Sequence, residues 1–342
     1  MMQKILVTGG TGYIGSHTVV ELQNAGYEVF IVDDLSNSSI EVLENISKIT
    51  GKKPFFEQFN LADAQKTDDF FSRNRDIEAI IHFAASKVVV ESLKMPLHYY
   101  RNNLVTLMNI LDCQLKFNIP NIVFSSSCTV YGQPNILPVT EQTPRNNAES
   151  PYGNSKKISE DILYDSTVAY PQLKGISLRY FNPIGAHPTA LIGELPTGVP
   201  QNLVPFIVQT AAGLHNELKV FGSDYNTPDG SAIRDYINVV DLAKAHVVVT
   251  ERLLKGRNKT NYEVFNLGTG EGLSVLQIVE GFERATGLKL KYKIVERRSG
   301  DIEKIWADTT YANNELCWKA ETGLEETLLS AWNWEKRMRG IE

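Results

Sequence analysis

Short apolar runs alternate with segments of helical spacing over the first half of the chain. The apolar runs are rich in β-branched and aromatic residues and poor in charge, which is typical of strands buried on both faces. They lie at residues 5–8, 28–32, 55–59, 79–83, 122–126 and 176–180. This alternation predicts an α/β fold of the Rossmann type, a doubly wound parallel sheet with helices between its strands.

The segments between these runs predict helices. The clearest carries an apolar stripe with a period near 3.6, made of Leu104, Leu107, Met108, Leu111 and Leu115. If this stripe does not face the sheet of its own chain, it is available to a second copy.

The alternation of strands and helices ends after residue 180. Residues 181–235 are rich in proline and glycine, as binding loops often are. One more strand is expected at 263–267 and a closing helix at about 324–339. We predict a nucleotide-binding domain at 1–180. A smaller, mixed α/β substrate domain is predicted at 181–342, with some of its segments packing back on the first.

Composition narrows the classes of function. The 342 residues include 34 Lys plus Arg and 40 Asp plus Glu, a net charge of −6 without a basic run. Such a chain lacks the electrostatic signature of a nucleic-acid or membrane-surface protein. Three widely spaced cysteines favour reduced thiols in the cytoplasm. The six histidines are dispersed, so we expect no metal, and no apolar run approaches membrane-spanning length.

The segment "ILVTGGTGYIG" reads as a strand, a glycine loop and the start of a helix. Gly9, Gly12 and Gly15 permit a tight turn, close approach of a pyrophosphate and packing of the helix on the strand. The helix N-terminus adds N–H groups and a positive dipole. Asp33 and Asp34 end the second strand, where a carboxylate bonds an adenosine ribose. Because a carboxylate there repels a 2′-phosphate, NAD is favoured over NADP.

Three further segments follow strand ends, "FAASK", "FSSSCTVYG" and "YGNSK", and are expected to meet in one crevice. Tyr152 and Lys156 lie four residues apart, on one helix face. A tyrosine with an ordinary pKa of about 10 needs nearby positive charge to act as a base near neutral pH. Lys156 and an oxidised nicotinamide supply it, and a serine such as Ser127 holds the substrate oxygen. A Tyr–Lys pair at this spacing occurs by chance in many proteins and is usually a solvated helix face, so the combination carries the interpretation.

Pro151 precedes the tyrosine and suits the first turn of a helix, where no N–H donor is required. We therefore expect that helix to begin within a residue or two of Tyr152.

Over essentially its whole length the chain resembles the extended short-chain dehydrogenase/reductase family, and within it the NAD-dependent epimerases of UDP-sugars. Seven segments carry the resemblance in the family's order: "VTGGTGYIGSHT", "IHFAASK", "FSSSCTVYG", "SPYGNSK", "LRYFNPIGAHP", "RDYINVVDLAKAH" and "NLGTGEGLSV". The resemblance implies reversible C4 epimerisation of UDP-glucose and UDP-galactose through a 4-keto intermediate, with Tyr152, Lys156 and Ser127 as catalytic residues.

The resemblance also implies the binding residues. Contacts to NAD are expected from Gly9, Gly12, Tyr13, Ile14, Gly15, Asp33, Asp34, Asn37, Ser38, Asn60, Phe83, Ala84, Lys87, Asn102, Ser125, Tyr152, Lys156 and Tyr180. Contacts to the UDP-sugar are expected from Lys87, Ser127, Tyr152, Asn182, Asn202, Leu203, Phe221, Arg234, Tyr236, Arg298, Asp301 and Ile305.

Within that set, Arg234 and Arg298 are expected to neutralise the diphosphate, since a guanidinium pairs well with phosphate oxygens. Asp301 is expected at the uridine ribose and Phe221 at the uracil. For Arg234 the alternative is an ion pair with Asp235 or Asp241, and for Tyr236 it is a plain core position.

Some positions depart from the family pattern. Asn60 stands where an Asp is usual, Asp34 where an Asn is more frequent, and Cys128 where a small Ala is. We interpret Cys128 as a small buried hydrophobe rather than a reactive thiol. Ile305 is intermediate between the Tyr of glucose-restricted relatives and the small residue of relatives that accept N-acetylated sugars. Weak activity on N-acetylhexosamines is therefore conceivable.

Two other functions stay open on this fold. A nucleotide-sugar 4,6-dehydratase or decarboxylase needs an acid in the serine segment, where this chain has Cys128 and Thr129. A non-catalytic NAD-binding module tends to lose the Tyr or the Lys, and both are present here. The resemblance further implies a homodimer built from the helices near 98–117 and 154–169.

Overall fold

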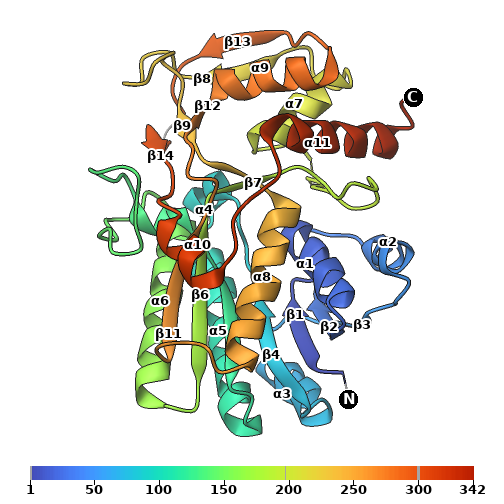
Figure 1. The fold of residues 1–342 in the computed structure, drawn as a ribbon, viewed down its shortest axis with the longest axis vertical. Coiled ribbons are helices and arrows are strands. Elements are labelled where there is room, and N and C mark those ends of the chain that lie inside the picture. The colour runs from blue at the N-terminus through green and yellow to red at the C-terminus, as the bar shows by residue number, and fades with distance from the viewer. Residues whose placement is uncertain (1, 197, 299–300) are drawn as a thin grey trace.

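The computed structural model describes residues 2–196, 198–298 and 301–342, and Figure 1 shows two tiers. The lower tier is a seven-stranded sheet with the order β3-β2-β1-β4-β5-β6-β11, parallel throughout. Its strands are β1 Lys4–Thr8, β2 Glu28–Asp33, β3 Phe55–Gln58, β4 Ile77–His82, β5 Asn121–Ser127, β6 Lys174–Tyr180 and β11 Tyr262–Leu267. The predicted doubly wound parallel sheet is confirmed, and each predicted strand lies within two residues of an observed one.

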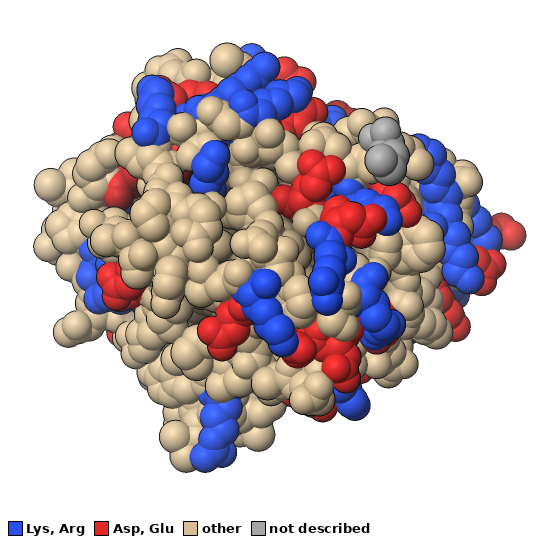
Figure 2. Space-filling model, turned by 90° about the horizontal axis from the view of Figure 1, so that it is seen from below, with Lys and Arg blue, Asp and Glu red and all other residues tan. Residues whose placement is uncertain are grey.

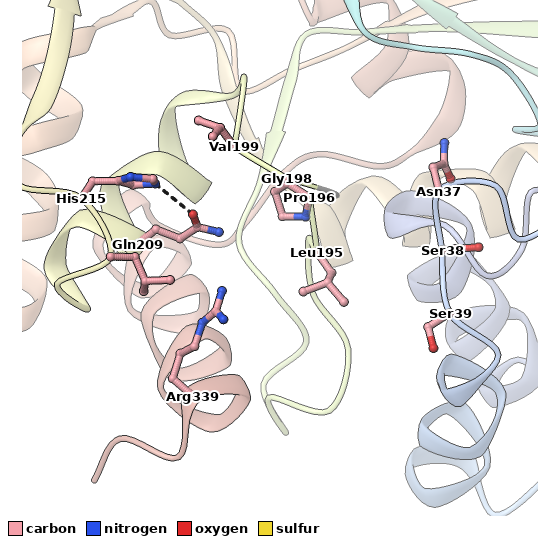
Figure 3. A pocket seen from close by; sticks show the side chains of 11 residues that line it. Asn37, Ser38, Ser39, Leu195, Pro196, Gly198, Val199, Gln209, His215 and Arg339 are labelled. Carbon is pink, nitrogen blue, oxygen red and sulfur yellow. Dashed lines mark hydrogen bonds between the residues drawn. The ribbon is translucent and has the colours of Figure 1, made fainter.

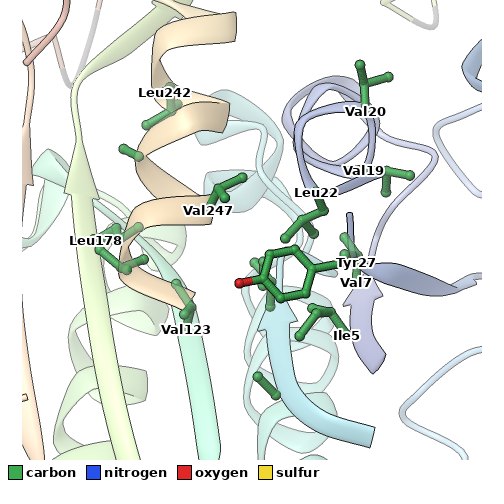
Figure 4. Close-up of a cluster of buried hydrophobic side chains, with 14 of the residues drawn as sticks. Ile5, Val7, Val19, Val20, Leu22, Tyr27, Val123, Leu178, Leu242 and Val247 are labelled. Atoms are coloured by element: carbon green, nitrogen blue, oxygen red, sulfur yellow. The ribbon is translucent and has the colours of Figure 1, made fainter. Parts of the chain in front are cut away.

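Helices cover both faces of this sheet. On one face lie α1 Tyr13–Asn24, α2 Glu41–Thr50 and α8 Val239–Leu254, and on the other α3 Ala64–Arg73, α5 Pro96–Phe117 and α6 Pro151–Ala169. Strand alternation assigns the core side chains: Ile5 and Val7 face α1 and α8, while Leu6 faces α3 and α5. Figure 4 shows the first of these two cores, between the sheet, α1 and α8.

The apolar stripe of α5 is only partly as predicted. Leu107 and Leu111 are buried against the sheet of their own chain, together with Ile110. Met108 is 42% exposed and does not belong to that face. The buried face of α5 is rotated away from Met108 because it includes the polar residue Asn103. A pattern of apolar residues alone does not reveal such a position.

The upper tier begins after β6 and contains short elements that the sequence pattern did not reveal. Its two parallel pairs are β7 Asn182–Ile184 with β10 Tyr236–Asn238, and β8 Leu218–Phe221 with β13 Tyr292–Val295. β9 Ile233–Arg234 lies between β12 Leu273–Ser274 and β14 Lys304–Ile305. The helices are α7 Leu203–Ala211, α9 Val275–Thr286 and α11 Leu324–Arg339. The remaining short helices are α4 Val89–Lys94, η1 Cys128–Tyr131 and α10 Thr310–Leu316.

The chain returns from the upper tier to the lower one. β11 pairs with β6 as the edge strand of the large sheet, and α8 packs on α1 (Figure 1). The carboxyl ends of β1, β4, β5 and β6 therefore point toward the upper tier, and the strand order reverses between β1 and β4. In open α/β sheets, ligands bind at such a switch point.

The surface seen in Figure 2 carries acidic and basic side chains interspersed with one another. Ion pairs such as Lys4–Asp76 and Lys116–Asp68 are consistent with this mixing. Within the described residues, no helix combines the length and the apolar character that crossing a membrane requires.

Candidate functional site

The glycine loop between β1 and α1 has the close backbone packing that its motif predicts. A Cβ on Gly15 would lie 2.2 Å from the carbonyl oxygen of Gly9, and one on Gly9 would lie 2.8 Å from the amide nitrogen of Ala84. Gly9 also has a positive φ of 69°. Gly12 is the N-cap of α1 and provides no side chain to cap it. The loop therefore leaves the start of α1 open to an anionic group, as a pyrophosphate requires.

Asp33, the last residue of β2, is hydrogen-bonded to the glycine loop. It is 8% exposed, and its two carboxylate oxygens accept the backbone N–H groups of Thr11, at 3.2 Å, and of Leu35, at 2.9 Å. Thr11 also bonds Ser38 through their hydroxyls at 2.7 Å. These bonds fix a carboxylate beside the glycine loop, where a dinucleotide ribose is expected.

The two unusual residues of this region are partners. The side-chain N–H of Asn60 donates to the Asp34 carboxylate at 2.9 Å, and the side-chain oxygen of Asn60 accepts the N–H of Ala62 at 2.8 Å. Relative to the family pattern, positions 34 and 60 have exchanged their amide and carboxylate side chains. One N–H···O bond between the two positions is therefore possible in either arrangement. The departure of Asn60 noted from the sequence is thereby coupled to that of Asp34.

A pocket of about 620 Å³ opens on the outer side of this region (Figure 3). Asn37, Ser38 and Ser39 form one wall, and Gln209, His215 and Arg339 stand opposite. The pocket adjoins two residues predicted to contact the cofactor, but it does not include Tyr152. It therefore borders the adenosine end of the predicted site rather than its chemical end.

Tyr152 enters the site from the first turn of α6. The helix begins at Pro151, and Ser150 caps it by accepting the N–H of Gly153 at 3.1 Å. The predicted helix start is confirmed. Lys156, one turn later and 4% exposed, donates from Nζ to the carbonyl oxygen of Ser125 at 2.5 Å.

The end of β5 supplies hydroxyl groups beside these two residues. The Ser127 hydroxyl lies near the Tyr152 phenol and affects its pKa, and the Ser125 hydroxyl bonds that of Tyr180 at the end of β6. Lys156 Nζ also lies 4.8 Å from the ring centroid of Phe124 and 6.0 Å from that of Tyr152. The predicted Tyr–Lys–Ser residues are thus brought together at the carboxyl edge of the sheet.

The charges in this cluster differ from the expectation of a tyrosine with a lowered pKa. Loss of hydration raises the pKa of Tyr152 to about 12, and the nearby Ser127 hydroxyl only partly opposes the rise. Burial lowers the pKa of Lys156 to about 7, against the attraction of Glu160. In the protein alone, desolvation therefore dominates the pKa of the phenol. Further positive charge is required before Tyr152 becomes a base near neutral pH.

The turn after β4 is braced by a residue that sequence reasoning missed. Asn103 accepts the N–H of Ser86 at 2.8 Å, and its own N–H group donates to Ser86 O and to Ser155 Oγ, both at 3.0 Å. Asn102, the predicted contact, donates to Ser86 Oγ at 3.2 Å. The polar side chain of Asn103 on the sheet-facing side of α5 was the available signal.

Other predicted cofactor residues line the same crevice. The Tyr13 hydroxyl donates to the carbonyl oxygen of Gly185 at 2.7 Å, which joins α1 to the upper tier. Ile14 packs against the core beside α8. Phe83 lies 4.8 Å from the ring of buried His246, and the N–H of Ala84 donates to Thr8 at 3.4 Å.

The upper tier places predicted substrate residues on paired short strands. Arg234 on β9 is in register with Ile305 on β14, and Tyr236 on β10 is in register with Asn182 on β7. Tyr236 is 7% exposed, and burial raises its pKa to about 12. Ile305 is 1% exposed and packs in a small cluster with Cys128.

Arg234 does not form the ion pair that was its alternative interpretation. Its guanidinium donates to the carbonyl oxygen of Ile233 at 2.8 Å. Asp235 instead accepts N–H groups of a neighbouring loop, and Asp241 accepts those of residues 321 and 322. Among the described residues, no ion pair of Arg234 is found.

A second cluster forms around Arg298. Its guanidinium binds Asp301 at 2.8 Å and lies 5.6 Å from the ring centroid of Phe221, which is 37% exposed. It also donates to Gln201 O at 3.4 Å. The two predicted uridine-side residues, Asp301 and Phe221, therefore lie together with Arg298, which is predicted at the diphosphate.

Glu194 is a second residue that the sequence did not single out. Asn202, the N-cap of α7, donates to its carboxylate at 2.7 Å, and Lys87 lies 4.0 Å from the same oxygen. Burial raises the pKa of Glu194. Its carboxylate joins a loop of the lower tier to a helix of the upper one, with Leu203 beginning that helix.

Cys128 is 7% exposed, and burial raises the pKa of its thiol to about 12. Its interpretation as a small buried residue is confirmed. In the part of the chain that the structure describes, no group of His, Cys, Asp or Glu is arranged to hold a metal ion.

Comparison with known proteins agrees with this geometry. The model of the GDP-mannose 4,6 dehydratase family matches residues 6–330. A UDP-glucose 4-epimerase of Bacillus subtilis is 48% identical over 331 residues, covering 97% of this chain and 96% of its own.

Solved structures give the same result. The UDP-glucose 4-epimerase of Bifidobacterium longum, in complex with NAD⁺ and UDP, has a TM-score of 0.95 at 44% identity and covers 99% of this chain and 100% of its own. That of Stenotrophomonas maltophila, with NAD and formylated UDP-arabinopyranose, also has a TM-score of 0.95 at 44% identity, covering 100% of both chains.

The fold and the Tyr–Lys–Ser cluster beside a glycine loop define the class of extended short-chain dehydrogenases/reductases. Within that class, the chain belongs to the UDP-glucose 4-epimerase family.

Proposed function

We propose that this protein interconverts UDP-glucose and UDP-galactose by reversible oxidation at C4. The observation that carries the proposal is the cluster of Tyr152, Lys156 and Ser127, placed at the carboxyl edge of the sheet beside the glycine loop. NAD is the cofactor, and when bound it accepts hydride from C4 and returns it.

The glycine loop fits this cofactor, because a side chain at Gly15 would collide with the backbone that turns around the pyrophosphate. Asp33 accounts for NAD rather than NADP, since its buried carboxylate repels a 2′-phosphate. Asn37, Ser38 and Asn60 lie toward the adenosine end. Tyr180, Ser125 and Lys156 lie toward the nicotinamide end.

Tyr152 takes the proton from the C4 hydroxyl, and Ser127 holds the same oxygen. Because desolvation raises the pKa of Tyr152 to about 12 in the protein alone, the phenol remains protonated until positive charge arrives nearby. Lys156 provides part of that charge. Once the 4-keto sugar has turned over in the site, C4 takes the hydride back on its other face and Tyr152 returns the proton to the C4 oxygen.

Residues 181–342, with their segments that return to the lower tier, bind the UDP-sugar in this proposal. Arg234 and Arg298 neutralise the diphosphate, Asp301 and Phe221 contact the uridine, and Asn182 and Asn202 contact the diphosphate or sugar. Tyr236 and Leu203 border the same site. Lys87 lies between the two ligands. The reaction serves galactose metabolism, and the free cysteines favour a cytoplasmic location.

A 4,6-dehydratase activity, which the name of the matching family model raises, is disfavoured. Elimination of water across C5 and C6 requires an acid in the serine segment. That place holds Cys128, whose thiol is too weak an acid because burial raises its pKa to about 12, and Thr129. The retained Tyr and Lys likewise disfavour a non-catalytic NAD-binding module.

Ile305 bears on sugar selectivity. It is buried beside Cys128 and Phe181, so its side chain fills space behind the serine segment. An isoleucine occupies less volume than a tyrosine, which supports weak acceptance of UDP-N-acetylhexosamines beside the main pair.

We also propose a homodimer through α5 and α6. Leu97 and Met108, three turns apart on α5, are 65% and 42% exposed. Tyr164 and Val168, one turn apart on the adjacent α6, are 54% and 63% exposed. Four large apolar side chains on two packed helices fit a second copy of the same surface.

The first prediction concerns Tyr152. We expect the unmodified protein to convert UDP-galactose to UDP-glucose without added NAD, and Tyr152→Phe to lose about 10²- to 10⁴-fold in kcat while it retains NAD. Product analysis by NMR and the ultraviolet spectrum of the released nucleotide check both. Tyr164→Phe, an exposed tyrosine of the same helix, is the control. Undiminished turnover by Tyr152→Phe would exclude the mechanism.

The second prediction concerns Ile305. We expect slow but measurable conversion of UDP-N-acetylglucosamine, and a gain of about tenfold in its kcat/KM relative to UDP-galactose in Ile305→Ala, because removal of the side chain beyond Cβ widens the pocket. Absence of N-acetyl turnover in both proteins, under conditions that rapidly convert UDP-galactose, would restrict the enzyme to the unsubstituted sugars.

The third prediction concerns the assembly. Sedimentation is expected to show a dimer, and Tyr164→Glu/Val168→Glu is expected to shift it to monomer by placing charge in the interface. Ile136→Glu, at a loop residue that is 76% exposed, should remain dimeric. A double variant that sediments as the unmodified protein does would place the interface elsewhere.

A further inference from the structure

A buried carboxylate lies directly behind the Tyr–Lys pair. Glu160 follows Lys156 by four residues and Tyr152 by eight on α6, so the three side chains share one face of the helix. Glu160 is 2% exposed and Lys156 is 4% exposed. A carboxylate this deeply buried is costly unless every oxygen is bonded.

Both oxygens of Glu160 are fully bonded. Oε1 accepts Ser126 Oγ at 2.5 Å and Arg179 Nε at 2.9 Å. Oε2 accepts Arg179 Nη2 at 2.6 Å and Arg145 Nη1 at 3.3 Å. The pairing with Arg179 is bidentate, the geometry that fixes a carboxylate most firmly.

The residues that bind Glu160 are adjacent in sequence to residues of the Tyr–Lys–Ser cluster and its hydrogen-bond partners. Ser126 lies between Ser125, whose carbonyl oxygen accepts Lys156 Nζ, and Ser127. Arg179 precedes Tyr180, whose hydroxyl bonds Ser125 Oγ. Alternate side chains of β5 and β6 therefore point to opposite sides of the sheet. Those of Ser126 and Arg179 point toward α6, and those of Ser125 and Tyr180 point toward the proposed site.

The charges around Lys156 leave Glu160 as the group that favours its ammonium form. His82 on β4 is neutral, because burial lowers its pKa to about 3. Burial raises the pKa of Tyr180 on β6, of Tyr262 on β11 and of Tyr131 on η1, so these phenols are neutral too.

Three charged side chains surround Glu160 or its partners. Arg179 is paired with Glu160 itself, and Arg145 is shared between Glu160 and Asp161, which it binds at 2.5 Å. Burial lowers the pKa of Lys156 to about 7, and the negative charge of Glu160 acts against that change. Without the carboxylate, the ammonium would have burial and the two guanidinium groups against it.

We propose that Glu160 is a positioning residue for the reaction, which fixes Lys156 through β5 and keeps it in the ammonium form. This inference rests on the proposed role of Lys156 in epimerisation. An ordinary structural ion pair would stabilise the fold without influencing the titration of Lys156. An effect on that titration therefore distinguishes Glu160 from such a pair.

The chain contains a matched control for that distinction. Arg252 on α8 binds Glu263 on β11 in the same bidentate manner, at 2.8 and 2.9 Å, and Glu263 is 6% exposed. Neither residue belongs to the Tyr–Lys–Ser cluster. Removal of either carboxylate takes the bidentate partner from a buried arginine and is expected to destabilise the fold, although Arg252 keeps a second carboxylate, Glu315, at 3.3 Å.

The experiment compares Glu160→Gln and Glu160→Gln/Arg179→Gln with Glu263→Gln and Glu263→Gln/Arg252→Gln. The titration of Lys156 is followed by the ¹³C shift of its Cε in protein carrying [ε-¹³C]lysine, and the signal is assigned by its loss in Lys156→Met. We expect the Lys156 pKa to fall by about one unit in Glu160→Gln, to fall by less in Glu160→Gln/Arg179→Gln, where a repelling guanidinium is removed as well, and to stay unchanged in both Glu263 variants.

The pH dependence of turnover gives a second reading. Lys156 loses its proton as the pH rises through its pKa, so a lower pKa moves the alkaline limb of kcat to lower pH in the Glu160 variants alone. An unchanged Lys156 titration in Glu160→Gln, or an equal change in Glu263→Gln, would overturn the proposal.

If the Gln variants do not fold, Glu160→Asp and Glu263→Asp retain the charge but withdraw it by one methylene. The Lys156 pKa should then fall, by a smaller amount, only in Glu160→Asp, and equal pKa values in the two would overturn the proposal. The NMR titration requires no turnover. A protein that failed to convert UDP-galactose would refute the proposed function while the role of Glu160 remained measurable.

Discussion

Burial of the Lys156 ammonium is the constraint on which the rest of the site depends. A positive charge that is 4% exposed loses hydration, and its pKa falls to about 7. The structure compensates with the Ser125 carbonyl oxygen on one side and the Glu160 carboxylate on the other. Tyr152 shares the desolvated environment, and its own pKa rises to about 12. In the proposed mechanism, the pair therefore requires positive charge that arrives with the cofactor.

This dependence explains the layout of the fold. The order β3-β2-β1-β4-β5-β6-β11 brings the glycine loop after β1 and the serine segment after β5 to one edge, on either side of β4. The start of α6 then delivers Tyr152 between them. The upper tier closes the crevice with paired short strands that carry Arg234, Tyr236 and Ile305. In the proposed mechanism, the reacting groups therefore lie on α6 and at the ends of long buried strands, while several substrate-binding groups lie on short strands.

The sequence predicted the large sheet well, because its strands are continuous apolar runs that no other element resembles. The Tyr–Lys–Ser cluster followed from spacing and from the rule that ligands bind at carboxyl ends of strands. Short strands such as β9 and β14 were missed, because two residues carry no periodicity. Glu160 and Asn103 were missed for another reason: single polar residues on an amphipathic helix look solvated until their partners on other elements are known.

Retention of hydrogen at C4 tests the central claim most directly. With UDP-[4-²H]galactose in ordinary water and no added NAD, the account predicts that UDP-glucose carries its deuterium at C4 undiminished, because the hydride leaves and returns within one site. Mass spectrometry and NMR of the product measure it. Loss of the deuterium to solvent would show that C4 is epimerised by proton exchange, and would contradict reversible oxidation at that carbon.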